Sequence, residues 1–117
     1  MSLALHQSDY FWADLARRVD WYRDQASPDL AERFVDAVQE TLQALTQTPA
    51  LGRLRFTRLT AWPELVGLRS WRVLPPFQRH LIFYRIDSEN LLAERLIHGT
   101  RDLPRRLLQP PDEPSDE

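Results

Sequence analysis

Three short apolar-rich runs follow one another in the second half of the chain, and they predict three β-strands. They are Leu68–Leu74, His80–Ile86 and Leu91–His98, each of ordinary strand length. Two consecutive prolines interrupt the chain after the first run, and proline cannot continue a strand ladder because it lacks an N–H group. A polar stretch of hairpin type, Asp87–Asn90, separates the second run from the third. Connections this short cannot cross over a sheet, so the pattern predicts an antiparallel meander.

The first half of the chain shows helical spacing. A short apolar run at residues 3–6 is expected to form a first strand, and Ser8 or Asp9 can then cap a helix by accepting from its free N–H groups. Apolar residues follow at steps of three and four, which predicts a helix with one buried stripe. The residues of this stripe are Phe11, Leu15, Val19, Tyr22 and Ala26.

A second helix is predicted to begin at Ser27-Pro28-Asp29, because serine caps, proline suits the first helical position and aspartate favours the positive helix end. Pro49 ends it. The tight link between the helices predicts an antiparallel hairpin, whose apolar stripes must be buried on the sheet. The second stripe consists of Leu30, Phe34, Ala37, Val38, Leu42 and Leu45.

The predicted fold class is therefore α+β, in the order β-α-α-β-β-β, with a helical hairpin packed on a mostly antiparallel sheet and room for a short C-terminal helix. Residues 1–108 form one predicted domain. Residues 50–67 are open to two interpretations, a loop or a short strand around Leu54–Leu59. Residues 109–117 are rich in proline and acid without an apolar anchor, which predicts a disordered tail.

Composition narrows the classes of function. The chain has no cysteine, so disulfides and thiolate metal sites are excluded. It has no paired-histidine metal motif, acidic cluster or glycine-rich phosphate loop, and we predict neither a metal nor a cofactor. No apolar run is long enough to span a bilayer, and the N-terminus does not resemble a signal peptide. We therefore expect a cytoplasmic protein without membrane contact.

Basic residues are unevenly distributed. All 15 are arginines, and 11 of them fall in residues 53–108 against five acidic residues. The planar guanidinium fork suits bidentate contact with phosphate or carboxylate. A coding bias toward arginine explains the absence of lysine equally well, but it does not explain the clustering. The clustering predicts a basic surface near the meander.

Several sequence stretches, in this order, carry a resemblance to a known family. The elements "SDYFWADLARRVDWY", "AERFVDAVQETLQAL", "GLRSWRV", "HLIFYRI" and "LIHGTRDL" are similar to those of the RelE/ParE superfamily of bacterial toxins, over about residues 3–107. The resemblance implies a small cytoplasmic toxin of a type II toxin–antitoxin system, of the kind linked to plasmid stabilisation. It also implies a cognate antitoxin as partner, in a heterotetramer or a larger assembly.

The resemblance implies two possible activities. RelE-like members cleave messenger RNA on the ribosome, whereas ParE-like members act on DNA gyrase and lack the nuclease residues. Carried over by position, Arg72, Arg79 and Arg101 fall where RelE-like members hold phosphate-facing basic groups. Leu74 and Leu107 fall where those members place two of their working polar groups.

The ParE-like branch is therefore favoured, as a gyrase inhibitor without catalytic residues. A RelE-like endoribonuclease is the alternative, because the cationic residues are present and His98 can act as a general base. A non-toxic interaction module of the same fold is the third. The catalytic set of the alternative is Arg72, Arg79, His98 and Arg101, and the predicted target-binding residues are Arg101, Arg105, Arg106 and Trp71.

Each of the remaining polar candidates also has a purely structural interpretation. His98 is more simply a residue that hydrogen-bonds the following turn, and His80 a residue at a strand end. Trp71 is more simply a core or groove-wall residue than a base-stacking one. Arg85 and Arg95 are expected on a solvated sheet face, or paired weakly with Glu94 and Asp87.

Overall fold

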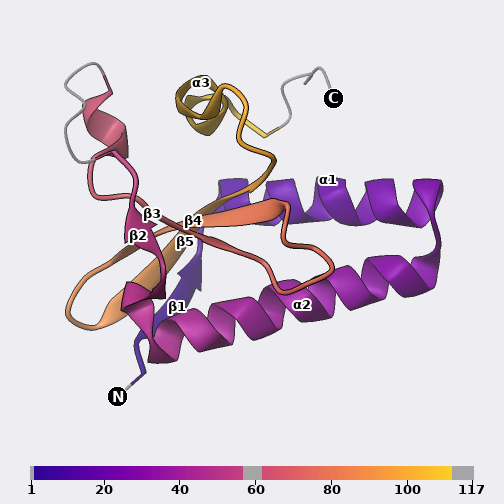
Figure 1. Cartoon of the computed structure of the whole chain (residues 1–117), viewed down its shortest axis with the longest axis horizontal. Helices are drawn as coiled ribbons and strands as arrows, with labels where there is room; N and C mark the ends of the chain where they lie inside the picture. The colour runs from indigo at the N-terminus through magenta and orange to yellow at the C-terminus, as the bar shows by residue number, and fades with distance from the viewer. Residues whose placement is uncertain (1, 57–61, 112–117) are drawn as a thin grey trace.

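The structure is a computed structural model that describes residues 2–56 and 62–111. Within these residues, five strands form one sheet in the order β1-β5-β4-β3-β2. The strands are β1 (Ala4–Gln7), β2 (Arg53–Leu54), β3 (Arg69–Arg72), β4 (His80–Ile86) and β5 (Asn90–His98). The helices are α1 (Asp9–Gln25), α2 (Pro28–Gln47) and α3 (Leu103–Leu108), with single 3₁₀ turns η1 (Pro49–Leu51) and η2 (Pro63–Leu65). Figure 1 shows α1 and α2 as a hairpin beside the sheet, with α3 apart from them.

The predicted meander is confirmed, since β3, β4 and β5 pair antiparallel in sequence order. The β4–β5 ladder contains a bulge: Phe83 lies opposite Arg95 and Tyr84 lies opposite Ala93, which leaves Glu94 as the extra residue. β1 pairs parallel with β5, so the sheet is mixed but mostly antiparallel. Residues 50–67, for which the sequence allows both a loop and a short strand, contain the two-residue strand β2. Within this region, residues 57–61 lie outside the described part.

The helical hairpin forms as the capping residues predict. Ser8 Oγ accepts a hydrogen bond from the Phe11 N–H at 3.0 Å, and Ser27 Oγ accepts one from the Leu30 N–H at 3.1 Å. The predicted stripes are mostly buried against the sheet, but Ala26 lies beyond the end of α1 and is exposed. The fully buried members are Phe11, Phe34, Val38, Leu42 and Leu45.

Side chains alternate across the sheet and divide the core in two. On β4, Ile82 and Tyr84 face the hairpin, whereas Phe83 packs with α3 on the opposite face. α3 contributes Leu103 and Leu107 to that second cluster. The sheet is thus the middle layer of the molecule, and the short C-terminal helix left as a possibility is present.

Tyr84 ties the centre of the sheet to the end of α2. Its hydroxyl donates to the Pro49 carbonyl at 2.6 Å and accepts from the Gly52 N–H at 2.9 Å. A Cβ atom on Gly52 would lie 2.3 Å from the same hydroxyl, so this position requires glycine for close approach rather than for an unusual backbone angle.

The part of the chain that the structure describes contains no helix with the length and apolar character needed to cross a membrane. Over the same residues, no cluster of three or more His, Asp or Glu is arranged to hold a metal ion.

Candidate functional site

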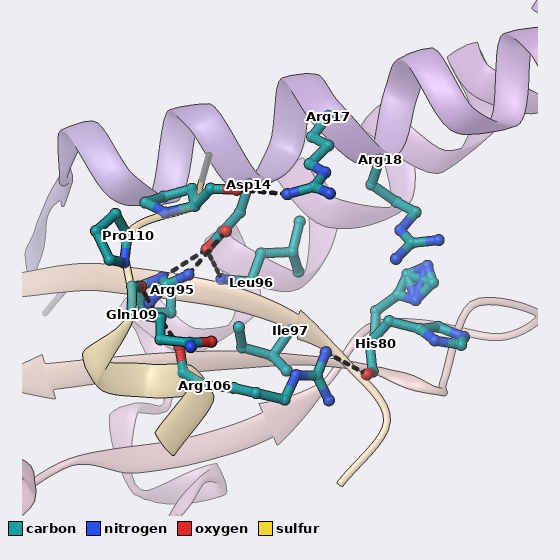
Figure 2. A pocket seen from close by; sticks show the side chains of 12 residues that line it. Asp14, Arg17, Arg18, His80, Arg95, Leu96, Ile97, Arg106, Gln109 and Pro110 are labelled. Carbon is teal, nitrogen blue, oxygen red and sulfur yellow. Dashed lines mark hydrogen bonds and ion pairs between the residues drawn. The ribbon is translucent and has the colours of Figure 1, made fainter. Parts of the chain in front are cut away.

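A cleft opens at the edge of β5 where β1 ends. β1 pairs with β5 only as far as Gln7 and Ala93, whereas β5 continues to His98. The exposed edge is flanked by α1 on one side and by α3 with the segment after it on the other (Figure 2). The cleft holds about 70 Å³ and is lined by Asp14, Arg17, Arg18, His80, Arg95, Leu96, Ile97, His98, Arg106, Gln109, Pro110 and Pro111.

A buried ion pair forms the floor of this cleft. Arg95 Nε and Nη2 donate to the two carboxylate oxygens of Asp14 at 2.8 and 3.0 Å, and both side chains are less than a tenth exposed. The Leu96 N–H, on the open edge of β5, donates to the same carboxylate at 2.9 Å. Asp14 therefore pairs a buried cation and also completes the strand edge that β1 leaves open.

Arg95 also holds the C-terminal segment. Its Nη1 donates to the carbonyl oxygens of Arg106, Leu107 and Gln109 at 3.1, 3.0 and 2.7 Å. These carbonyls lie in the last turn of α3 and just beyond it, where backbone carbonyls lack a full set of partners within the helix; that of Arg106 also accepts from the Gln109 N–H at 3.3 Å. The guanidinium thus fixes α3 to β5 and α1 at once.

The expectation that Arg95 is solvated, or paired with a nearby acid, is wrong. Its partner Asp14 is 81 residues away in sequence, and α1 and α3 together cover it. Arg85 differs: one of its predicted pairs is confirmed, since Nε lies 2.6 Å from Glu94 Oε2. Both side chains of that pair are about a third exposed, so it contributes little to stability.

His80 lies at the inner end of the cleft and is only 2% exposed. Its Nε2 is 3.1 Å from the Tyr22 hydroxyl, and its ring packs edge-on against Phe34 and His98. Burial, followed by the positive charges of His98 and Arg18, lowers the pKa of His80 from 6.5 to about 3. His80 is therefore neutral at pH 7. The interpretation of His80 as a strand-end residue gives its place in β4 but misses its burial under the helical hairpin.

Arginines approach the cleft from both flanks. Figure 2 shows Arg17 and Arg18 reaching from α1, and Arg106 reaching from α3. Arg17 donates to the Pro111 carbonyl at 2.6 Å, and Arg106 donates to the His98 carbonyl at 2.8 Å. With Arg95, the described residues of the lining include four arginines and one carboxylate, and their net charge is positive.

The structure places three of the four residues of the nuclease alternative, Arg79, His98 and Arg101, near one end of the sheet. The Gly99 N–H donates to the Arg79 carbonyl at 2.9 Å, so Arg79 is near the end of β5 where His98 and Arg101 also lie. Arg72 is at the end of β3, exposed, with its guanidinium 4.8 Å from the centre of the Trp71 ring. Of the four, only His98 lines the cleft.

Two leucines stand where the RelE-like nuclease pattern has polar groups, and they differ in burial. Leu107 is 6% exposed and belongs to the second core cluster, whereas Leu74 is 38% exposed in the turn after β3. Leu107 is therefore a core residue, and its side chain is not available to a substrate.

The predicted target-binding residues fall into three environments. Trp71 is partly buried against the first core cluster, the place expected of a core or groove-wall residue. Arg101 is exposed in the turn before α3, and Arg105 is exposed on α3, where it makes a loose contact of 3.4 Å with Asp102. Arg106 points into the cleft instead.

The cleft residues contributed by α1 were missed by sequence reasoning. Asp14, Arg17 and Arg18 fall off the apolar stripe of this helix, so the stripe gave no reason to place them at a site. One signal could have found them: residues three and four apart share a helix face, and this spacing puts an acid and two arginines on one face. What the helix faces was not readable from that spacing.

Comparison with known proteins agrees with this architecture. The sequence profile of the family described as "ParE toxin of type II toxin-antitoxin system, parDE" matches residues 5–103. A chain in a solved structure of the chromosomal ParDE TA system from P. aeruginosa superposes with a TM-score of 0.66 at 18% sequence identity. The superposition covers 85% of this chain and 98% of that one, and at this identity it supports the fold alone. No curated protein matches the sequence.

Proposed function

The chain belongs to the ParE toxin family of type II toxin–antitoxin systems, and from that premise we propose that it inhibits DNA gyrase in the cytoplasm and is neutralised by a cognate antitoxin. The burial of Leu107 is the observation that carries the choice of target. Where the RelE-like nuclease pattern calls for a polar group near the C-terminus, this chain has a core side chain.

The burial of His80 supports the same choice. Cleavage through a ribose 2′-hydroxyl needs a group that takes a proton and a group that gives one. His80 is a poor candidate for either role near pH 7, because its pKa of about 3 keeps it neutral and weakly basic. Arginine is a poor general base because its pKa is far above neutral. A toxin that acts by binding a protein needs no such pair of groups.

The turn before α3 and α3 itself offer a surface suited to binding. Arg101 and Arg105 are exposed there, while Leu103 and Leu107 anchor the helix to the sheet. Exposed arginines on a rigid, well-anchored element are suited to contacting a partner protein. This basic surface is the proposed contact with gyrase, and it contains two of the predicted target-binding residues, Arg101 and Arg105.

The proposal is tested by comparing two purified systems. Adding the protein should lower supercoiling by gyrase, and messenger RNA on programmed ribosomes should remain uncut. Arg101→Ala and Arg105→Ala should each weaken inhibition by roughly tenfold, about 1.4 kcal/mol of binding free energy. Arg33→Ala is the matched control, because Arg33 is an exposed arginine on α2.

The nuclease alternative makes a distinct prediction. Codon-specific RNA cleavage that is lost in His98→Ala would reverse the assignment. A protein that affects neither gyrase nor ribosomes, and does not slow growth when it is induced alone, would favour the non-toxic module.

Neutralisation by an antitoxin is tested by co-expression. We expect the product of a neighbouring short reading frame to co-purify with the protein and to restore supercoiling. The mass of the purified complex then reports whether it is a heterotetramer or a larger assembly. A neighbouring product that binds but leaves inhibition intact would contradict neutralisation.

A further inference from the structure

The basic cleft has a feature that the interactions within the fold do not explain. His80 is 2% exposed, and its Nδ1 atom has no hydrogen-bond partner among the residues that the structure describes. A buried polar atom without a partner is costly and uncommon in folded proteins. His80 is one of the residues that line the cleft, so this unsatisfied ring lies beside the arginines of the lining.

The positively charged lining favours the binding of an anion. Among the described residues that line the cleft, four are arginines and one is a carboxylate, Asp14, which pairs with Arg95. Guanidinium groups bind carboxylates through short, charge-assisted hydrogen bonds, and a cleft with walls of one charge concentrates the opposite charge. Figure 2 shows Arg17 and Arg18 on one side of the cleft and Arg106 on the other, an arrangement that can hold carboxylates from two sides.

Acidic residues follow the cleft wall directly in the sequence. Pro110 and Pro111 form part of the cleft wall, and Arg17 binds the Pro111 carbonyl at 2.6 Å. The next six residues, 112–117, read DEPSDE and carry four acidic side chains. An extended segment of this length spans up to about 20 Å, and it is joined to the chain at Pro111, a residue of the cleft wall.

We propose that the cleft is a binding site for peptide carboxylates and that the acidic segment Asp112–Glu117 of the same chain occupies it. Arg17, Arg18 and Arg106 hold the carboxylates, and His80 completes the site from the inner end. Occupation in cis engages Arg106, one of the predicted target-binding residues, so it also limits what else can bind there. This proposal does not depend on gyrase being the target.

The full-length protein allows a direct test. In the matched variant, the four tail acids are changed to amides as D112N, E113Q, D116N and E117Q, which keeps the length and removes the charge. Arginine Nε–H signals of Arg17, Arg18 and Arg106 in NMR spectra should differ between the two proteins, while that of Arg33 should not. The difference should shrink as salt is added, because it arises from partly exposed charges.

A second experiment adds the ligand from outside. The capped peptide DEPSDE should bind the amide-tail variant at least about tenfold more tightly than the native chain, because a tethered segment competes at roughly millimolar effective concentration. An amide version of the peptide, NQPSNQ, should not bind. In the amide-tail protein, Arg18→Gln and Arg106→Gln should each weaken peptide binding by about tenfold, and Arg33→Gln should have no effect.

Two results would overturn the proposal. Equal binding of the acidic peptide to the native and amide-tail proteins, with unchanged cleft signals, would exclude the tail as occupant. Binding that Arg18→Gln and Arg106→Gln leave unaffected would exclude the cleft as the site. Either result is independent of whether the protein inhibits gyrase.

Discussion

Lowering the pH should destabilise the fold through His80 in particular. His80 is neutral in the folded protein because its pKa is about 3, whereas in the unfolded chain it titrates near 6.5. The unfolded state therefore binds one more proton between these values, and stability falls as pH decreases through that window. The contribution of His80 is fully present above pH 6.5 and is lost progressively toward pH 3.

The expected size follows from the two pKa values. Each unit of difference corresponds to about 1.36 kcal/mol, so going from pH 7 to pH 5 should remove about 2 kcal/mol of unfolding free energy through this residue alone. That is a substantial part of the 5–15 kcal/mol typical of a small domain. Urea unfolding at pH 7, 6 and 5 measures it, provided that the slope against urea is unchanged.

His80→Gln is the matched variant, since glutamine keeps a polar side chain near the Tyr22 hydroxyl but does not titrate. The other histidines and the carboxylates are common to both proteins, so the difference between the two pH profiles isolates His80. We expect the native protein to lose about 2 kcal/mol more than the variant between pH 7 and pH 5. Parallel profiles would refute the reasoning, because they would mean that His80 has the same pKa in the folded and unfolded states.

Three further changes test the framework around the cleft. Arg95→Met leaves the Asp14 carboxylate buried without its cation, and urea unfolding should show a loss of about 3–5 kcal/mol; a loss below about 1 kcal/mol would contradict a buried pair. Gly52→Ala places a Cβ 2.3 Å from the Tyr84 hydroxyl and should cost about 1–3 kcal/mol in thermal unfolding; an unchanged melting temperature would show that this contact yields. Ser27→Ala should cost about 1 kcal/mol and Ser27→Asp close to none; equal losses in chemical denaturation would mean that the cap at α2 does not stabilise the helix.

The elements of the fold were predictable because their signals are local. Ser8 and Ser27 mark the helix starts, and the apolar-rich run His80–Ile86 marks a strand with buried residues on both faces. The meander followed from connection length alone. Each of these features depends on residues a few positions apart, and the sequence displays such patterns directly.

The cleft was not predictable, because it depends on which elements meet. Arg95 looks like one of several strand arginines until α1 brings Asp14 to it and α3 covers it. The bulge at Glu94 shifts the register of β5 against β4, and no residue type at that position predicts a bulge. Residues 109–111 looked like the start of a free tail, yet Arg95 binds the Gln109 carbonyl and Arg17 binds that of Pro111, so the packed part of the chain reaches Pro111.

The parallel pairing of β1 with β5 has a consequence for synthesis of the protein. Ala4 pairs with Asn90, 86 residues later, and α1 is tied to the sheet through Asp14 and Arg95. The first strand therefore has no partner strand in the sheet, and Asp14 on α1 lacks its buried cation, until the last strand has been made. At about 5–20 residues per second, translation of the intervening segment takes about 4–17 s. The basic cleft, and any activity that depends on it, can arise only once nearly the whole chain has left the ribosome.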